Sequence, residues 1–305
     1  MSKLTTIVSY PERGEGGNNK YRGNCSPKLI SDLINHFKVA EICDYMHGSG
    51  TTRDAANSAG IKSNVYDLHS GFDLVNSEIP ERSEFTFWHP PYWNIIKYSG
   101  VMYSATEVQS KYGYDPKESD LSRIDSWDEF VKVMNHCMIK QFCALEKGGR
   151  MAVLVGDIKR MGKLYSMIFE LVKPGTLEQH VIKAQHNCFS SNTSYNGKFI
   201  PIVHEHLLLL RKDSPLQYQI LKTLNYSIDI RDIKSATWKD IVADVMESFG
   251  NEAVELEQIY SKVAKSPKTK SNEHWKDKVR QTLQLHKNLF TSPQKGKWAK
   301  KLQAA

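Results

Sequence analysis

The chain has little of what membrane and secreted proteins depend on. Among its 305 residues no apolar run approaches the length needed to cross a bilayer, so we expect no membrane association. Its five cysteines are scattered and form no Cys-x-x-Cys pair, which favours reduced thiols over disulfides or a zinc site. The first six residues carry no apolar signal core, and we therefore expect a cytoplasmic protein.

Acidic residues are scarce at the end of the chain. The net charge of +7 at pH 7 is modest, but residues 261–305 hold twelve Lys or Arg and only two acids, Glu273 and Asp277. Such a local excess of positive charge favours a polyanion as the partner. The alternative is a basic tail that is simply solvated.

Helical and strand patterns alternate through the first two thirds of the chain. They predict helices at 27–37, 51–59, 127–145 and 163–172, and strands at 39–46, 64–68, 84–88, 150–155, 179–184 and 206–211. The strands are nearly continuous in apolar residues, as expected of a mainly parallel sheet that is covered on both faces. The sequence therefore predicts a doubly wound α/β domain over residues 1–213.

A second unit follows a less regular connection at residues 214–235. Helical patterns recur at 237–249, 254–263 and 275–285, and two short strands flank a turn at 292–296. Three helices followed by a basic hairpin are the pattern of a winged helix. We predict a small winged-helix domain over residues 236–305.

The most informative segment is residues 86–93, where an apolar strand stops at His89-Pro90-Pro91-Tyr92. The two prolines fix the backbone and remove two donors, so nearby carbonyl groups are left to accept hydrogen bonds from a ligand. Tyr92 offers a flat face and His89 a polar group. This combination suits a planar heterocycle with an exocyclic amine, although an ordinary proline turn after a core strand is the alternative.

Two further segments should reach the same edge of the sheet, where doubly wound folds bind ligands. Residues 44–52 contain Gly48-Ser49-Gly50, which permits a tight turn and close approach of a ligand before a helix N-terminus. Asp67 ends the next strand, where nucleoside-binding folds place an acceptor for a ribose hydroxyl. A helix or turn cap is an equal alternative for Asp67.

Glycine turn, strand-end acid and proline turn follow one another as in S-adenosylmethionine-dependent DNA amino-methyltransferases, and the chain resembles that family over roughly residues 20–212. Residues 44–52 look like the family's Asp-x-Phe-x-Gly-x-Gly motif, and Asn24-Cys25-Ser26-Pro27 looks like its further cofactor motif. The resemblance implies a Rossmann-like methyltransferase sheet and S-adenosylmethionine as cofactor. The implied cofactor-binding residues are Asn24, Ser26, Pro27, Asp44, Tyr45, Gly48, Ser49, Gly50, Thr51 and Asp67.

His89-Pro90-Pro91-Tyr92 matches the family's catalytic motif at three of four positions, because His89 stands where Asp, Asn or Ser is usual. We expect neutral His89 and the carbonyl of Pro90 to accept hydrogen bonds from the target amine, while Tyr92 stacks on the base. Adenine N6 is the expected target. Cytosine N4 and a catalytically weak DNA-binding module remain alternatives.

A duplex target requires the base to be rotated out, and double-stranded DNA is the expected partner. The polar segment 97–120, with Lys97 and Tyr98, could close over the base, and segment 186–198 could contact DNA. The C-terminal unit resembles winged helix-turn-helix domains of bacterial restriction and defence proteins, which implies Lys276 and Arg280 on a recognition helix and Lys297 at the wing. A restriction or defence partner is possible on the same resemblance.

Two polar segments lie outside these motifs. Asp157 follows a predicted strand, where it could line the target pocket or cap a loop, and we slightly favour the cap. His204-Glu205-His206 invites a metal interpretation because side chains two apart on a strand face the same way. No third ligand is evident, so we predict no metal site.

Overall fold

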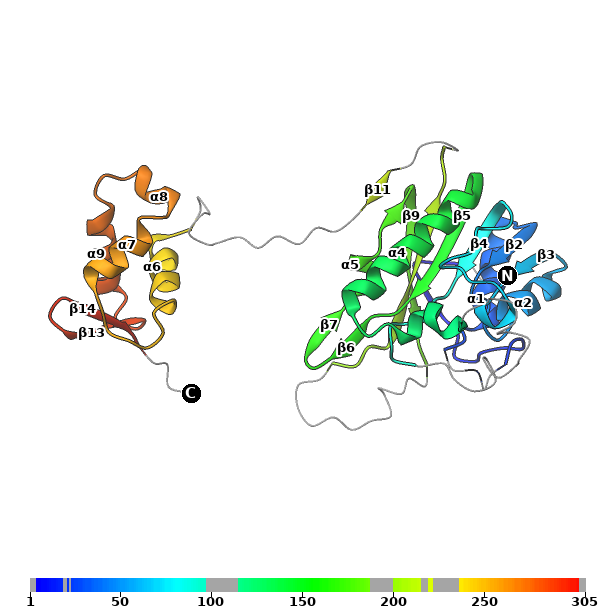
Figure 1. The fold of residues 1–305 in the computed structure, drawn as a ribbon, viewed down its shortest axis with the longest axis horizontal. Coiled ribbons are helices and arrows are strands. Elements are labelled where there is room, and N and C mark those ends of the chain that lie inside the picture. Colours follow the sequence, from blue (N-terminus) through cyan, green and yellow to red (C-terminus); the bar gives the residue numbers. More distant parts are fainter. Residues whose placement is uncertain are drawn as a thin grey trace. The chain divides into compact units, whose positions relative to one another are not determined.

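The computed structural model describes residues 4–18, 21, 23–96, 115–186, 200–214, 219–221 and 236–301. The chain divides into two compact units, Met1–Thr223 and Leu224–Ala305 (Figure 1). No helix within these described ranges is long and apolar enough to cross a membrane.

A seven-stranded sheet forms the centre of the first unit (Figure 1). Its strands, in spatial order, are β1 (Ile7–Ser9), β9 (Thr176–Ala184), β10 (His204–Arg211), β5 (Leu145–Val155), β4 (Ser83–Trp88), β2 (Glu41–Asp44) and β3 (Lys62–Val65). Only β10 runs antiparallel to its neighbours β5 and β9, and the other four pairings are parallel. The predicted mainly parallel α/β sheet is confirmed.

Helices cover both faces of this sheet. Helix α1 (Pro27–Phe37) packs with β2, β4, β5 and β10 in one apolar cluster, and α4 (Trp127–Ala144) packs in a second cluster. Successive residues of β5 alternate between the clusters: Met151 and Val153 face α4, whereas Ala152 and Leu154 face α1. A strand buried on both faces reads as one continuous apolar run, which is why the sequence predicted it.

The chain changes direction at β2. From β2 it passes through α2 (Thr51–Ala59) to β3 at the sheet edge, and then returns to β4 on the other side of β2. The crossovers therefore diverge between β2 and β4, and this is the position at which doubly wound sheets bind ligands. Short 3₁₀ helices η1 (Leu68–Ser70), η3 (Pro116–Ser119) and η4 (Leu121–Arg123) belong to the same unit.

The helix predicted at 163–172 is wrong for most of its length. Strands β6 (Ile158–Arg160) and β7 (Lys163–Tyr165) form a hairpin, and only α5 (Met167–Glu170) is helical. Met161 and Gly162 make the turn with φ of 49° and 77°, a two-residue geometry that suits tight hairpins. This turn contains neither of the dipeptides Asn-Gly and Asp-Gly that usually indicate a tight hairpin in a sequence.

The first unit also extends into the segment that the sequence assigned to a connection. Strand β11 (Ile220–Leu221) pairs antiparallel with β8 (Lys173–Pro174). Two residues of the predicted connection at 214–235 therefore belong to a small sheet of the first unit.

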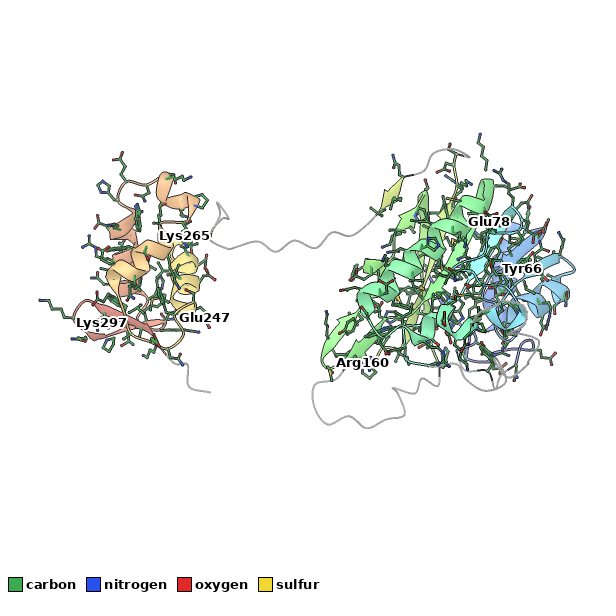
Figure 2. The ribbon with its side chains drawn as sticks, viewed as in Figure 1. Tyr66, Glu78, Arg160, Glu247, Lys265 and Lys297 are labelled. Atoms are coloured by element: carbon green, nitrogen blue, oxygen red, sulfur yellow. The ribbon has the colours of Figure 1, made fainter. Side chains whose placement is uncertain are left out.

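The second unit has its own apolar core, formed by α6 (Trp238–Glu247), α7 (Leu256–Val263), α9 (Trp275–Leu285) and β13 (Phe290–Gln294). Strand β14 (Lys297–Lys300) lies between β13 and β12 (Val254–Glu255) in a three-stranded sheet. A short helix, α8 (Pro267–Lys270), joins α7 to α9. Lys297 begins β14 directly after the hairpin turn (Figure 2).

Candidate active site

The glycine turn after β2 is held from within by Asp44. Its carboxylate accepts hydrogen bonds from the backbone N–H of Met46 (3.0 Å) and from the hydroxyl of Thr52 (2.5 Å). Burial raises the pKa of Asp44 to about 7, and the charge of Asp67 acts in the same direction. Gly48 and Gly50 have φ of 51° and 88°, so this turn favours glycine at both positions.

Asp67 joins the end of β3 to the same turn. It accepts from the N–H of Gly48 (2.9 Å) and from the N–H of His69 (3.1 Å), and it caps η1. Burial alone would raise the pKa of Asp67. The hydrogen bond from the His69 side chain and the opposite charge of that ring outweigh burial, so the pKa of Asp67 is lowered. Asp67 therefore acts as a cap, and it also lies on the wall of a cavity.

That first cavity opens between the carboxyl ends of β2, β3 and β4. Predicted residues on its wall are Asn24, Asp44, Gly48, Ser49, Thr51, Asp67, His89 and Pro91. The sequence missed one part of it, formed by Phe72, Leu74, Val75 and Leu121 around the buried carboxylate of Asp73. Asp73 accepts from the N–H groups of Val75 and Asn76, which fixes this loop. The only sequence signal was an apolar stretch broken by one acid.

Four other predicted cofactor residues lie elsewhere among the described residues. Tyr45 is buried in the core and stacks on Tyr66, with ring centroids 5.5 Å apart. Pro27 occupies the first turn of α1, Ser26 caps that helix, and Gly50 precedes α2. These residues shape the elements that surround the cavity, and their contact with a cofactor stays a prediction.

The proline turn ends β4 beside this cavity. The side chain of His89 is 11% exposed, and its partial burial lowers its pKa to about 4 although the charge of Glu205 opposes the shift. The imidazole is therefore neutral at pH 7. A neutral ring can accept a hydrogen bond, which the proposed role of His89 requires.

A series of hydrogen-bonded side chains, which the sequence did not predict, links His89 to strands β9 and β10. Nε2 of His89 lies 2.9 Å from the Tyr92 hydroxyl, which donates to Glu205 at 2.6 Å. Lys183 donates to the other oxygen of Glu205 at 2.5 Å. Burial would raise the pKa of Glu205, but the opposite charge of Lys183 outweighs burial and lowers it.

A second cavity lies on the other side of the proline turn. Its wall includes the remaining predicted catalytic residues, Pro90 and Tyr92, together with Ser26, Asp157 and Glu205. Of the residues that the structure describes, five line both cavities: Gly23, Asn24, Cys25, His89 and Pro91. The two cavities therefore meet at the proline turn, so that a group bound in one can approach a group bound in the other.

Asp157 has the capping role that the sequence favoured. It accepts from the hydroxyl of Ser166 (2.9 Å) and from the N–H of Met167 (3.0 Å) at the start of α5, and it also lies 3.3 Å from His206. Among the residues that the structure describes, no group of three His, Cys, Asp or Glu side chains could hold a metal ion.

The predicted DNA-binding residues fall into two groups. Lys97 and Tyr98, like most of segment 97–120 and nearly all of segment 186–198, lie outside the described residues. In the second unit, Lys276 and Arg280 are exposed one turn apart on α9. Arg280 is already paired with Asp277, and the ammonium of Lys276 lies 5.1 Å from the centroid of the Tyr260 ring.

No protein-family model matches the chain, and no curated protein is significantly similar to it. Similar solved structures include TrmN from Thermus thermophilus, with 14% identity, 63% of this chain and 50% of that chain covered, and a TM-score of 0.29. TehB from Haemophilus influenzae is 11% identical over 61% of this chain and 62% of that chain, with a TM-score of 0.25. SibL, an S-adenosylmethionine-dependent methyltransferase solved in its apo form, is 10% identical over 61% of this chain and 55% of that chain, with a TM-score of 0.24.

The chain thus spans 50% to 62% of the length of these structures. The chain itself provides a mainly parallel α/β sheet with two cavities that meet at a largely enclosed, neutral histidine, His89.

Proposed function

We propose that the first unit is an S-adenosylmethionine-dependent methyltransferase. The observation that carries this proposal is the meeting of two cavities at His89 and Pro91, because methyl transfer needs donor and acceptor sites that share a wall. When bound, S-adenosylmethionine supplies a methyl group activated by a sulfonium. The family resemblance and the position at the strand crossover support the same assignment.

The residues of the first cavity suit the parts of this cofactor. Asp67, beside the N–H of Gly48, would accept from the ribose hydroxyls. Phe72, Leu74 and Leu121 offer an apolar wall to the adenine ring, with the carboxylate of Asp73 near its amine. Asn24 lines both cavities and would hold the methionine end. Asp44, whose pKa is raised to about 7 by burial, would be stabilised in its charged form by a cationic ligand.

The second cavity would receive the exocyclic amine of a flipped base, and adenine N6 in double-stranded DNA is the proposed target. His89 and the carbonyl of Pro90 would accept from the amine, and Tyr92 would provide the flat wall. Attack of the amine nitrogen on the methyl carbon forms the C–N bond and breaks the C–S bond. The amine then loses one proton to solvent. Cytosine N4 is the alternative target.

The decisive experiment is incubation of the full chain with methyl-labelled S-adenosylmethionine and duplex DNA, followed by digestion to nucleosides. Label in deoxyadenosine supports the proposal, and label in deoxycytidine supports the alternative. No label, together with tight DNA binding, would replace the enzyme by a catalytically weak DNA-binding module. His89→Ala should abolish most of the label, and an undiminished rate in that variant would remove His89 from the reaction.

We also propose that the second unit is a winged helix that binds duplex DNA through α9 and the β13–β14 turn. Replacement of Lys276 and Arg280 by Ala should weaken DNA binding and reduce the dependence of log affinity on log salt by up to about two, since each phosphate contact contributes about 0.9. Lys265→Ala, which removes an exposed charge outside α9, is the matched control. If control and variant bind DNA equally, a protein-binding winged helix is the better explanation.

A further inference from the structure

Glu205 and Lys183 form a buried ion pair next to the proposed active site. They lie directly opposite each other on the antiparallel strands β10 and β9, so their side chains share one face of the sheet. Their carboxylate and ammonium groups are 2.5 Å apart, and side-chain exposures of 7% and 10% leave little access to water. The cost of removing both charges from water offsets much of their attraction, so a buried ion pair adds little net stability. Stability alone therefore does not account for this pair.

The contacts of Glu205 determine where the proton of Tyr92 lies. Glu205 is ionised beside Lys183, so the short contact between its oxygen and the Tyr92 hydroxyl requires Tyr92 to donate. Tyr92 has a single hydroxyl proton. The contact of 2.9 Å between Tyr92 and Nε2 of His89 must then be donated by His89.

The same logic fixes the tautomer of His89. In a neutral imidazole only one nitrogen carries a proton, and here that nitrogen is Nε2. Nδ1 is therefore the lone-pair nitrogen. A histidine without a fixed tautomer would present an N–H to the amine for part of the time, and it would then repel rather than accept.

We propose that Glu205, held by Lys183, is a positioning residue that acts through Tyr92 to keep Nδ1 of His89 free as the acceptor for the target amine. The inference rests on the proposed methyl transfer for its consequence, but not for its geometry. It explains how a histidine can serve where the resembling family uses Asp, Asn or Ser.

Gly156 supports the same arrangement. It follows β5, and a Cβ atom at this position would lie 2.6 Å from Cε2 of Tyr92. The absence of a side chain at residue 156 therefore lets the Tyr92 ring lie between His89 and Glu205. We call the hydrogen bonds from Lys183 through Glu205 and Tyr92 to His89 the relay. It depends on strands β9 and β10 and on the turns that follow β4 and β5, so no single segment of sequence contains it.

The first test is the tautomer itself. Long-range ¹H–¹⁵N spectra of the histidine-labelled full chain near pH 7, with His89 assigned by a His89→Asn variant, should show a neutral ring protonated at Nε2. Tyr92→Phe and Glu205→Gln should each shift His89 toward a mixture of tautomers or toward the Nδ1-protonated form. A wild-type ring protonated at Nδ1 would overturn the inference, whatever the enzyme does.

The second test is catalytic. Glu205→Gln should lower kcat for methyl transfer by about 100-fold, as expected when one preorganised hydrogen-bond partner is lost, with little change in KM for the cofactor. Glu178→Gln is the matched control, because it also removes a carboxylate that bridges strands of this sheet but lies far from His89. Equal rates for both variants would overturn the inference. A confirmed Nε2–H tautomer without methyl transfer to any base would instead refute the proposed function and leave the relay in place.

Discussion

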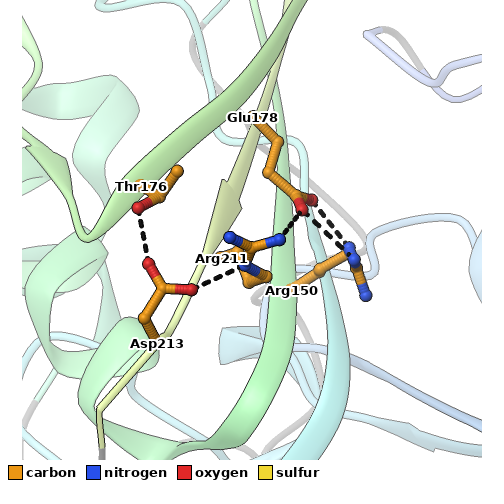
Figure 3. Close-up of polar contacts among 5 residues, drawn as sticks. All are labelled: Arg150, Thr176, Glu178, Arg211 and Asp213. Carbon is orange, nitrogen blue, oxygen red and sulfur yellow. Dashed lines mark hydrogen bonds and ion pairs between the residues drawn. The ribbon is translucent and has the colours of Figure 1, made fainter.

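Two polar clusters lie at opposite ends of the paired strands β9 and β10, and they differ in what surrounds them. Near the start of β9 and the end of β10, Glu178 accepts from Arg150 and Arg211, at 2.7 Å each, and Arg211 also binds Asp213 (Figure 3). At the other end, Glu205 joins Lys183 to Tyr92 and His89. We call the first group the Glu178 cluster and the second the Glu205 cluster.

Exposure separates them. Side chains in the Glu178 cluster are up to 51% exposed, whereas in the Glu205 cluster the ion pair and His89 are at most 11% exposed. Water and salt screen the Glu178 cluster, so its ion pairs contribute little to stability. The Glu205 cluster is far less exposed, so its charges are screened less and each partner depends more on the others. Ion pairs of similar residue types on β9 and β10 can therefore have different roles. At one end they link neighbouring strands, and at the other they position a side chain of the proposed active site.

The largest expected effect comes from breaking the Glu205 cluster. Lys183→Met should reduce the free energy of unfolding of the first unit by about 3 kcal/mol, because it leaves the Glu205 carboxylate buried without its cation. Urea unfolding followed by tryptophan fluorescence would measure this loss. A loss below 1 kcal/mol would mean that water reaches Glu205 and that the two clusters do not differ.

A similar effect should follow from pH at His89. Its folded pKa of about 4 lies below the ordinary 6.5, so the unfolded state binds more protons between these values and stability falls as pH drops through this window. The full shift corresponds to about 3 kcal/mol. His89→Asn should remove this part of the pH dependence. His47 and His180 also contribute to the dependence of stability on pH in this variant, because burial lowers their pKa values as well.

A smaller effect is expected from crowding the Tyr92 ring. Gly156→Ala should cost about 1–2 kcal/mol of stability, because the added Cβ overlaps the ring and must displace it. The methyl-transfer rate should fall as well, since the ring carries the link from Glu205 to His89. A rate equal to that of the unmodified chain would show that the position of Tyr92 is not critical.

The smallest effect should come from the Glu178 cluster. Glu178→Gln is expected to change the free energy of unfolding by less than about 1 kcal/mol, and the change should shrink as salt is added because the cluster is partly solvated. Unfolding at low and high salt would measure both features. A large loss that does not respond to salt would remove the contrast between the two clusters.

Local signals in the sequence predicted much of this architecture. Helices at 27–37 and 275–285 appear with the predicted bounds, because Ser26 and Pro27 mark the start of one and apolar spacing marks the other. The hairpin at Met161 and Gly162 was missed because its turn lacks the usual residue pair. In His204-Glu205-His206 the spacing of the histidines is typical of a metal site, whereas no local signal indicates that Glu205 accepts a hydrogen bond from Tyr92.

By itself, the sequence determined the alternation of strands and helices, the glycine turn at 44–52 and the proline turn at His89. These depend on residues that are close in the chain, so propensity, capping and fixed backbone angles are sufficient to reveal them. Only the tertiary structure decided which nitrogen of His89 carries the proton. Glu205 and Tyr92 are 113 residues apart in the chain, and they meet because antiparallel β10 inserts between β5 and β9. That pairing depends on the whole sheet.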